Sequence, residues 1–256
     1  MAFLIRTLAA TFYDGHHIEP HAHAWGQLIY AASGVMRVRA GDTLWLVPPA
    51  RAIWAPAGAR HEIFARGDFA MRTLYIEPTL AASLPTTCRA VEVSPLLREL
   101  ILRLVGLGML DEDLPAHVRL ARVAIDEIAA AEVLPLSIAL PADPRALRVA
   151  ERLQAAPALD AELDELAQGA GASARTIQRL FLKQTGLRFA DWRQRLRLLH
   201  AAGLLGAGAS VTEAGFEAGY AGTSAFIAAF RRQFGRTPAR MRGPAAAAVE
   251  RRPAPR

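Results

Sequence analysis

Two histidines separated by a single residue, His21 and His23, are the first side chains in the chain whose spacing suggests chemistry. Side chains alternate along a β-strand, so a His-x-His pair on a strand directs both imidazole rings to one face. Neutral imidazoles gathered in this way bind divalent transition metals. They also donate and accept hydrogen bonds, so the same pair is compatible with a pocket for a small molecule.

The two histidines are part of a longer pattern. Gln27 follows His23 by four residues, and Pro56–His61 has the sequence Pro-Ala-Gly-Ala-Arg-His. These segments resemble the two motifs of cupin β-barrels, His-x-His with a Glu four residues on, and Pro-x-Gly-x-x-His. The resemblance implies a metal or effector pocket formed by His21, His23, Gln27 and His61, with Gln27 where the family has Glu.

The glutamine affects which ion the pocket would prefer. Without the carboxylate, the charge of a bound ion is less well neutralised, which favours nitrogen-preferring metals such as zinc, nickel or copper. Two alternatives remain open at this stage. The histidines of the pocket either form hydrogen bonds to an organic effector or are a relic that only packs.

A second set of suggestive spacings lies nearer the C-terminus. Ala167, Gly171 and Ile177 have the spacing of a helix-turn-helix unit, with a small residue at the helix contact, a glycine in the turn and an apolar residue facing the core. A second copy of the unit uses Gly215, Gly219 and Phe226. The predicted helix 189–205 between the copies spans about 26 Å, and the helix ends extend this toward the roughly 34 Å between successive major-groove faces. The repeat therefore predicts two DNA-reading units on one side of a duplex.

The sequence of the second copy points to a particular family of helix-turn-helix proteins. Gly219–Arg242, GYAGTSAFIAAFRRQFGRTPARMR, resembles the signature of the AraC/XylS family of transcriptional regulators, and Ser173–Gly186 is similar to the family's first recognition helix. Cupin-type domains are the usual N-terminal partners of this DNA-binding domain, so the two resemblances support each other.

The family resemblance implies which residues contact DNA. In the first recognition helix the base-reading positions are Arg175, Gln178 and Arg179; arginine pairs with guanine and glutamine with adenine in the major groove. The equivalent positions of the second helix are Thr223, Ser224, Ile227 and Ala228. Many members have arginine in place of Ala228, so we expect this helix to depend more on phosphate and thymine-methyl contacts. The candidates for phosphate contacts are Arg188, Arg193, Arg231, Arg232 and Arg236.

The elements that position these residues follow from local patterns. Short Val-, Ile-, Leu- and aromatic-rich runs broken by Gly and Pro predict a barrel over residues 15–80. Apolar residues at helical spacing predict a helical hairpin over 94–132. The expected fold class is α+β with two domains: a cupin-like sensing and dimerisation domain over 1–135, a proline-rich linker over 136–144, an all-α tandem helix-turn-helix domain over 145–243, and a flexible tail over 244–256.

Composition restricts the protein class. The chain of 256 residues is 52% hydrophobic, enough for folded cores, and its single cysteine excludes a disulfide framework. No apolar run approaches the roughly 20 residues of a membrane span, and the N-terminus lacks a signal-peptide pattern, so we expect a cytoplasmic protein without membrane contact. Net charge is −3 over residues 1–143 and +9 over 144–256, which indicates that the second half meets a polyanion.

These observations predict a transcriptional regulator that is not an enzyme. Its expected partners are double-stranded DNA, a small-molecule or metal effector in the barrel, and a second copy bound through the helical hairpin. The alternative from another class is a metal-dependent cupin enzyme, an oxygenase or isomerase, fused to a DNA-binding domain. A third interpretation is a DNA-binding protein that responds to no effector.

Overall fold

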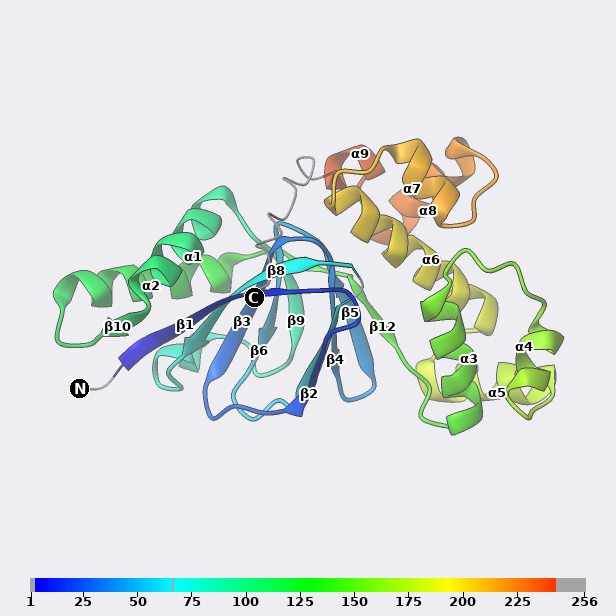
Figure 1. Cartoon of the computed structure of the whole chain (residues 1–256), viewed down its shortest axis with the longest axis horizontal. Helices are drawn as coiled ribbons and strands as arrows, with labels where there is room; N and C mark the ends of the chain where they lie inside the picture. The colour runs from blue at the N-terminus through cyan, green and yellow to red at the C-terminus, as the bar shows by residue number, and fades with distance from the viewer. Residues whose placement is uncertain (1–2, 66, 243–256) are drawn as a thin grey trace, which may run out of the picture.

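In a computed structural model that describes residues 3–65 and 67–242, the chain forms an N-terminal domain of two β-sheets and a C-terminal domain of helices (Figure 1). The predicted tail, 244–256, lies outside the described residues. None of the described helices combines the length and the apolar character needed to cross a membrane.

The two sheets of the N-terminal domain face each other, and this pair of antiparallel sheets is called the barrel below. One has the strand order β10-β1-β8-β3-β6-β9-β11, the other β12-β5-β4-β7-β2, and all the recorded pairings are antiparallel. The strands are β1 (Phe3–Phe12), β2 (His17–His21), β3 (Gly26–Ser33), β4 (Met36–Ala40), β5 (Thr43–Val47), β6 (Arg51–Ala55), β7 (His61–Ala65), β8 (Phe69–Ile76), β9 (Arg89–Glu92), β10 (Met109–Asp111), β11 (Val133–Leu134) and β12 (Ser137–Ala139). A short 3-10 helix, Leu80–Ser83, follows β8.

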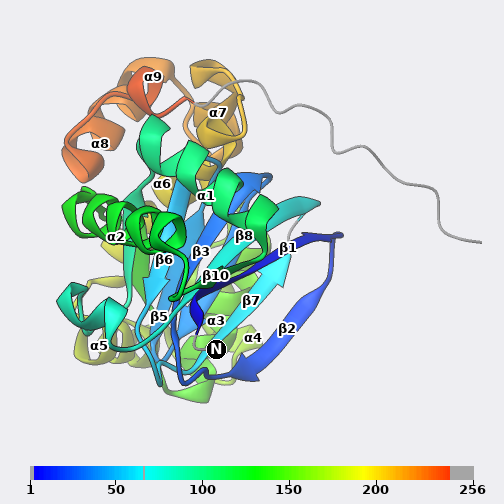
Figure 2. The ribbon, with the colours of Figure 1, turned by 90° about the vertical axis from the view of Figure 1, so that its left-hand side faces the viewer.

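Alternation along the strands creates two separate apolar faces. Ile29 and Ile53 of the seven-stranded sheet meet Val38 and Ile63 of the five-stranded sheet in the space between the sheets. The opposite face of the seven-stranded sheet is covered by the helical hairpin, α1 (Pro95–Leu107) and α2 (Pro115–Ala130), as Figure 2 shows. The predicted hairpin is thus confirmed, and its apolar stripes pack on its own domain.

Two predicted boundaries were wrong. The barrel begins at β1, well before residue 15, because Phe3–Phe12 pairs with β8 on one side and β10 on the other. The segment 136–144 is not a free linker. Its residues Ser137–Ala139 form β12 against β5, with Ile138 buried in the core. The surrounding prolines therefore bound a short edge strand, where proline is tolerated.

The C-terminal domain contains the predicted helix-turn-helix pair. Its helices are α3 (Pro144–Ala155), α4 (Leu163–Gly169), α5 (Ala174–Thr185), α6 (Phe189–Gly206), α7 (Val211–Glu217), α8 (Thr223–Phe234) and α9 (Pro238–Met241). Ser173 caps α5, and a reciprocal capping box of Ser210 and Glu213 begins α7. Gly171 and Gly219 adopt positive φ, as the two turns require. Local sequence therefore fixes both turns.

The long helix α6 joins the two helix-turn-helix units and also contacts the barrel. The Trp192 ring nitrogen donates to the Ala139 carbonyl at 2.7 Å, and Arg195 donates to Ser137 at 2.9 Å. Near the end of α6, Gly206 lies so close to Pro48 that a Cβ would be 2.4 Å from its ring. One continuous apolar cluster consequently extends from the barrel into the C-terminal helical domain.

Candidate DNA-reading helices and sensing pocket

The first candidate reading surface is the outward face of α5. Arg175, Gln178 and Arg179 are all exposed, and their spacing places them on one side of the helix. The opposite side is fixed by Ile177 and Phe181, which are fully buried. The helix therefore presents the three predicted base-reading side chains to solvent from a rigidly packed support.

The second candidate surface is the corresponding face of α8. Ser224, Ile227, Ala228, Arg231 and Arg232 line one open hollow of about 700 Å³. Thr223 is exposed at the first turn of the same helix. A Cβ on Gly215 would lie only 3.0 Å from the ring of Phe226, so glycine lets α7 approach α8 closely. This face is less polar than that of α5.

The candidates for phosphate contacts divide into two groups. Arg188, Arg231 and Arg232 are exposed, and Arg188 is the N-cap residue directly before α6. The Arg193 guanidinium instead donates to the backbone carbonyls of Leu159 and Ala161, so it supports the loop before α4. Arg236 forms ion pairs with the N-terminal domain, at Glu92 and Glu132. No local pattern in the sequence indicates these two long-range arrangements.

The three predicted histidines meet where β2 ends and β7 begins. His21 is the last residue of β2 and His61 the first of β7, whereas His23 lies beyond β2, so the expected placement of both His21 and His23 on one strand was wrong. His21 lies opposite His61 in the strand register, and ligating nitrogens of His21, His23 and His61 all lie within 4.8 Å of one another. The Nδ1–H groups of His21 and His61 donate to the carbonyls of Glu19 and Ala59, at 2.7 Å and 2.9 Å. A carbonyl only accepts, so these bonds leave the Nε2 lone pair of both rings available to a ligand.

Burial favours the neutral imidazole form of His23 and His61. The Nε2 atoms of His23 and His61 are buried with no hydrogen-bond partner among the described residues. Burial lowers the pKa of both imidazoles, and their histidine neighbours lower each pKa further. Neutral imidazoles with free Nε2 atoms are the state that a transition-metal ion requires.

Gln27 lies on β3 and faces the same interior space. Its side-chain amide donates to the Thr73 hydroxyl at 3.1 Å, and Thr73 donates to the Leu28 carbonyl. The Gln27 Oε1 atom is buried and has no recorded partner. Tyr75 lies directly opposite Gln27 in the strand register, and its ring contacts the His23 ring edge-to-face, with 4.9 Å between the ring centroids. Thr73 and Tyr75 are thus neighbours of Gln27 and His23 that the motifs did not indicate, because β8 carries no motif residue.

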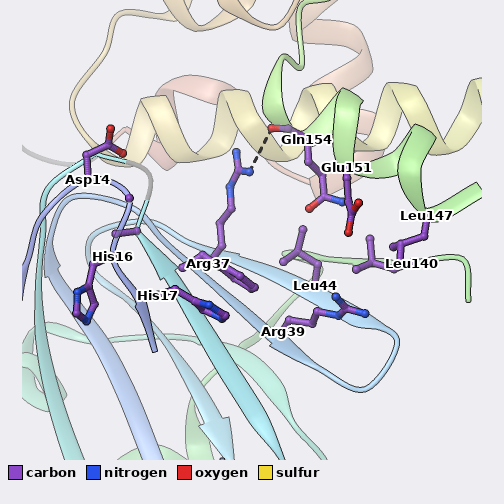
Figure 3. A pocket seen from close by; sticks show the side chains of 13 residues that line it. Asp14, His16, His17, Arg37, Arg39, Leu44, Leu140, Leu147, Glu151 and Gln154 are labelled. Atoms are coloured by element: carbon purple, nitrogen blue, oxygen red, sulfur yellow. Dashed lines mark hydrogen bonds between the residues drawn. The ribbon is translucent and has the colours of Figure 1, made fainter. Parts of the chain in front are cut away.

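A separate cavity of about 440 Å³ lies outside the barrel, between the five-stranded sheet and α3 (Figure 3). Arg37 and Arg39 project into it from β4, beside Phe64 of β7, while Glu151 and Gln154 face it from α3. Arg37 donates to the Gln154 carbonyl at 3.2 Å, so the arginine bridges the two domains. Sequence alternation places Arg37 and Arg39 on the outer face but does not indicate that α3 covers them.

Comparisons with known proteins agree with this architecture. Residues 6–124 match the model of the AraC-like ligand binding domain, and residues 166–243 match a helix-turn-helix domain model. The chain is 35% identical to the HTH-type transcriptional regulator NimR of Escherichia coli K12 over 220 residues, 86% of this chain and 80% of NimR. It is 44% identical over 99 residues to the HTH-type transcriptional regulator RipA of Corynebacterium glutamicum, 39% of this chain and 30% of RipA.

A solved structure also aligns along most of the chain. ToxT of Vibrio cholerae O395 covers 92% of this chain and 96% of its own, with 10% identity and a TM-score of 0.40. The extended identity to NimR, together with the order of the two matched domains, decides the assignment. The chain belongs to the AraC family of helix-turn-helix transcriptional regulators.

Proposed function

We propose that the protein is a sequence-specific DNA-binding regulator whose N-terminal domain senses a small molecule or a metal ion. The observation that supports this most directly is the pair of exposed faces on α5 and α8, each held by a buried apolar side. Such a pair suits reading of successive major grooves by one chain. Because its relatives are named as transcriptional regulators, we infer a regulator rather than an enzyme.

The two helices would contribute differently to specificity. Arg175, Gln178 and Arg179 on α5 would form hydrogen bonds to base edges. On α8, Thr223 and Ser224 supply short hydroxyls, and Ile227 and Ala228 suit thymine methyl groups. The exposed Arg188, Arg231 and Arg232 would hold phosphates and set the register without reading sequence.

The histidine cluster fits a divalent transition-metal ion. His21, His23 and His61 would be the ligands, and Gln27 is the candidate for a neutral oxygen donor from the facing sheet. Zinc, nickel or copper suits this nitrogen-rich set better than magnesium or calcium. An ion bound there would supply a cross-link between β2 and β7. A metal-dependent enzyme is the second candidate, and the unpartnered imidazoles are the observation that favours it.

An effector would act through the arrangement of the two domains. If the two domains can adopt two arrangements, a ligand shifts the equilibrium between them only by the difference in its affinity for each. The cavity between β4 and α3 is lined by both domains, so its occupant would change contacts whenever the domains move. A second copy would bind through the helical hairpin, where Leu96 and Val123 are exposed; sedimentation of the full chain tests that association.

Selection of bound duplexes from a random DNA pool tests the function. We expect the full chain to enrich a defined sequence, and Arg175→Ala to relax it at individual positions. Failure to enrich any sequence would contradict specific DNA binding, whereas turnover of a substrate by the metal-loaded full chain would support the enzyme alternative.

A further inference from the structure

Arg236 occupies the point where the second reading unit meets the sensing domain. It follows α8 directly, after the left-handed cap residue Gly235. One terminal nitrogen donates to Glu92 Oε2 at 2.9 Å, and the other contacts both carboxylate oxygens of Glu132 at 2.6 Å. Both carboxylates belong to the N-terminal domain, so this side chain connects the end of a candidate DNA-reading helix to the barrel.

The two carboxylates form part of a fixed acidic edge. Glu92 lies on β9, and its second oxygen contacts the buried Arg51 at 3.1 Å. Glu127 lies beside them in a hollow of about 320 Å³ that Glu92 and Glu132 also line. An acidic surface of this kind attracts a guanidinium and repels a DNA backbone.

Arg236 differs from its neighbours on α8. Arg231 and Arg232 are exposed and have no ion pair with any described residue. An arginine guanidinium pairs with carboxylate and with phosphate through the same two-pronged geometry. A guanidinium already engaged by two carboxylates has few donors left, so a phosphate would have to displace them.

We propose that Glu92 and Glu132 hold Arg236 in place of a DNA phosphate, so that the sensing domain weakens duplex binding until the second reading unit moves away. This inference rests on the proposed DNA-binding function. Domain separation would release the arginine and carry the acidic edge away from the duplex, and both effects favour binding. The acidic edge is thus an internal competitor of DNA.

The test uses the full chain and a fluorescently labelled duplex of about three helical turns with random sequence, because phosphate contacts do not depend on base identity. Glu132→Gln removes one carboxylate charge from the edge. The Glu132 side chain is 61% exposed and the Arg236 side chain 21%, so the substitution is made at the more exposed partner of the pair. Glu92 is left intact because Arg51 depends on it. We expect about a two- to fivefold gain in affinity at 50 mM salt, the range that such ion pairs contribute. The gain should shrink at 200 mM salt, because salt screens the internal pair.

A double-mutant cycle separates this competition from a general charge effect. Glu132→Gln should produce a clearly smaller gain in an Arg236→Gln background, where only the loss of its repulsion of DNA remains. Glu112→Gln, which removes an exposed acid elsewhere on the domain, should not reproduce the full gain. Equal gains in both backgrounds, or no gain in the wild-type background, would overturn the inference. A full chain that binds no duplex at any salt concentration would contradict the proposed function itself, and the inference would fall with it.

Discussion

The contact between Gly206 and Pro48 allows the domain interface to be tested with one methyl group. A Cβ on Gly206 would lie 2.4 Å from Pro48 Cβ and 3.2 Å from its Cγ. Carbon atoms pack at about 3.5–4.0 Å, so the two segments would have to separate by about 1 Å. Proline is a rigid ring next to β5, so it has little freedom to turn aside. Gly206→Ala should therefore strain or open the interface.

The expected loss combines two opposing effects. Overpacking of a tight contact costs about 1–3 kcal/mol, whereas replacing glycine by alanine near a helix end gains at most about 1 kcal/mol. We predict a net fall of up to about 2 kcal/mol in the free energy of unfolding. Urea titration followed by tryptophan fluorescence measures it, because Trp192 donates to Ala139 across the same interface.

Gly106→Ala is the matched control. Gly106 is also near the end of a helix, α1, but a Cβ there meets no atom within 4 Å. This variant should be as stable as the wild type or more so, and the difference between the two variants isolates the clash. If Gly206→Ala is as stable as Gly106→Ala, the domains do not pack at Pro48 in solution and the reasoning is refuted.

Three further predictions concern individual side chains. Arg179→Ala should lose about 1–3 kcal/mol of DNA-binding free energy through one base position. Arg231→Ala should weaken binding to all DNA sequences alike and lower the slope of log affinity against log salt concentration by about 1. The reverse pattern in binding titrations would exchange the roles of the two arginines. Burial and the charge of Arg37 lower the pKa of His200 to about 4. As pH falls from 6.5 to 4, His200 therefore takes up a proton in the unfolded state but stays neutral in the folded state. Unfolding titrations should show up to about 3 kcal/mol lost across that range, and His200→Gln should flatten the dependence; an unchanged dependence would contradict this. Elemental analysis should find zinc, nickel or copper in the full chain and in the control His16→Ala, which removes an exposed histidine outside the cluster. It should find none of these metals in His61→Ala, and equal content in all three proteins would contradict the metal site.

Local signals account for the parts of the fold that the sequence predicted. Turn glycines such as Gly171 and Gly219, and the Ser210–Glu213 capping box, act over a few residues and are readable without a structure. Helical spacing likewise predicted the hairpin. The strand β1 was missed because it lacks the Gly and Pro punctuation of the later strands, and β12 because the surrounding prolines indicated a linker.

The candidate site was predicted only where short motifs carry it. His21, His23 and His61 are brought together as expected, because His21 and His23 are two residues apart in the chain and His61 belongs to the second motif. His21 ends β2, however, and His23 lies beyond the strand. The roles of Arg193 and Arg236 depend on partners 32 to 144 residues away, which no local pattern reveals. The cavity beside Arg37 depends on how two domains pack, which is a property of the assembled chain.

We propose that α5 and α8 of one chain address successive major grooves on one side of the duplex. Inserting five base pairs between the two halves of the selected site tests it directly, because half a helical turn moves the second groove to the opposite side. We predict that affinity for the inserted duplex falls to that of DNA carrying one half alone. Unchanged affinity for the inserted duplex would contradict the claim.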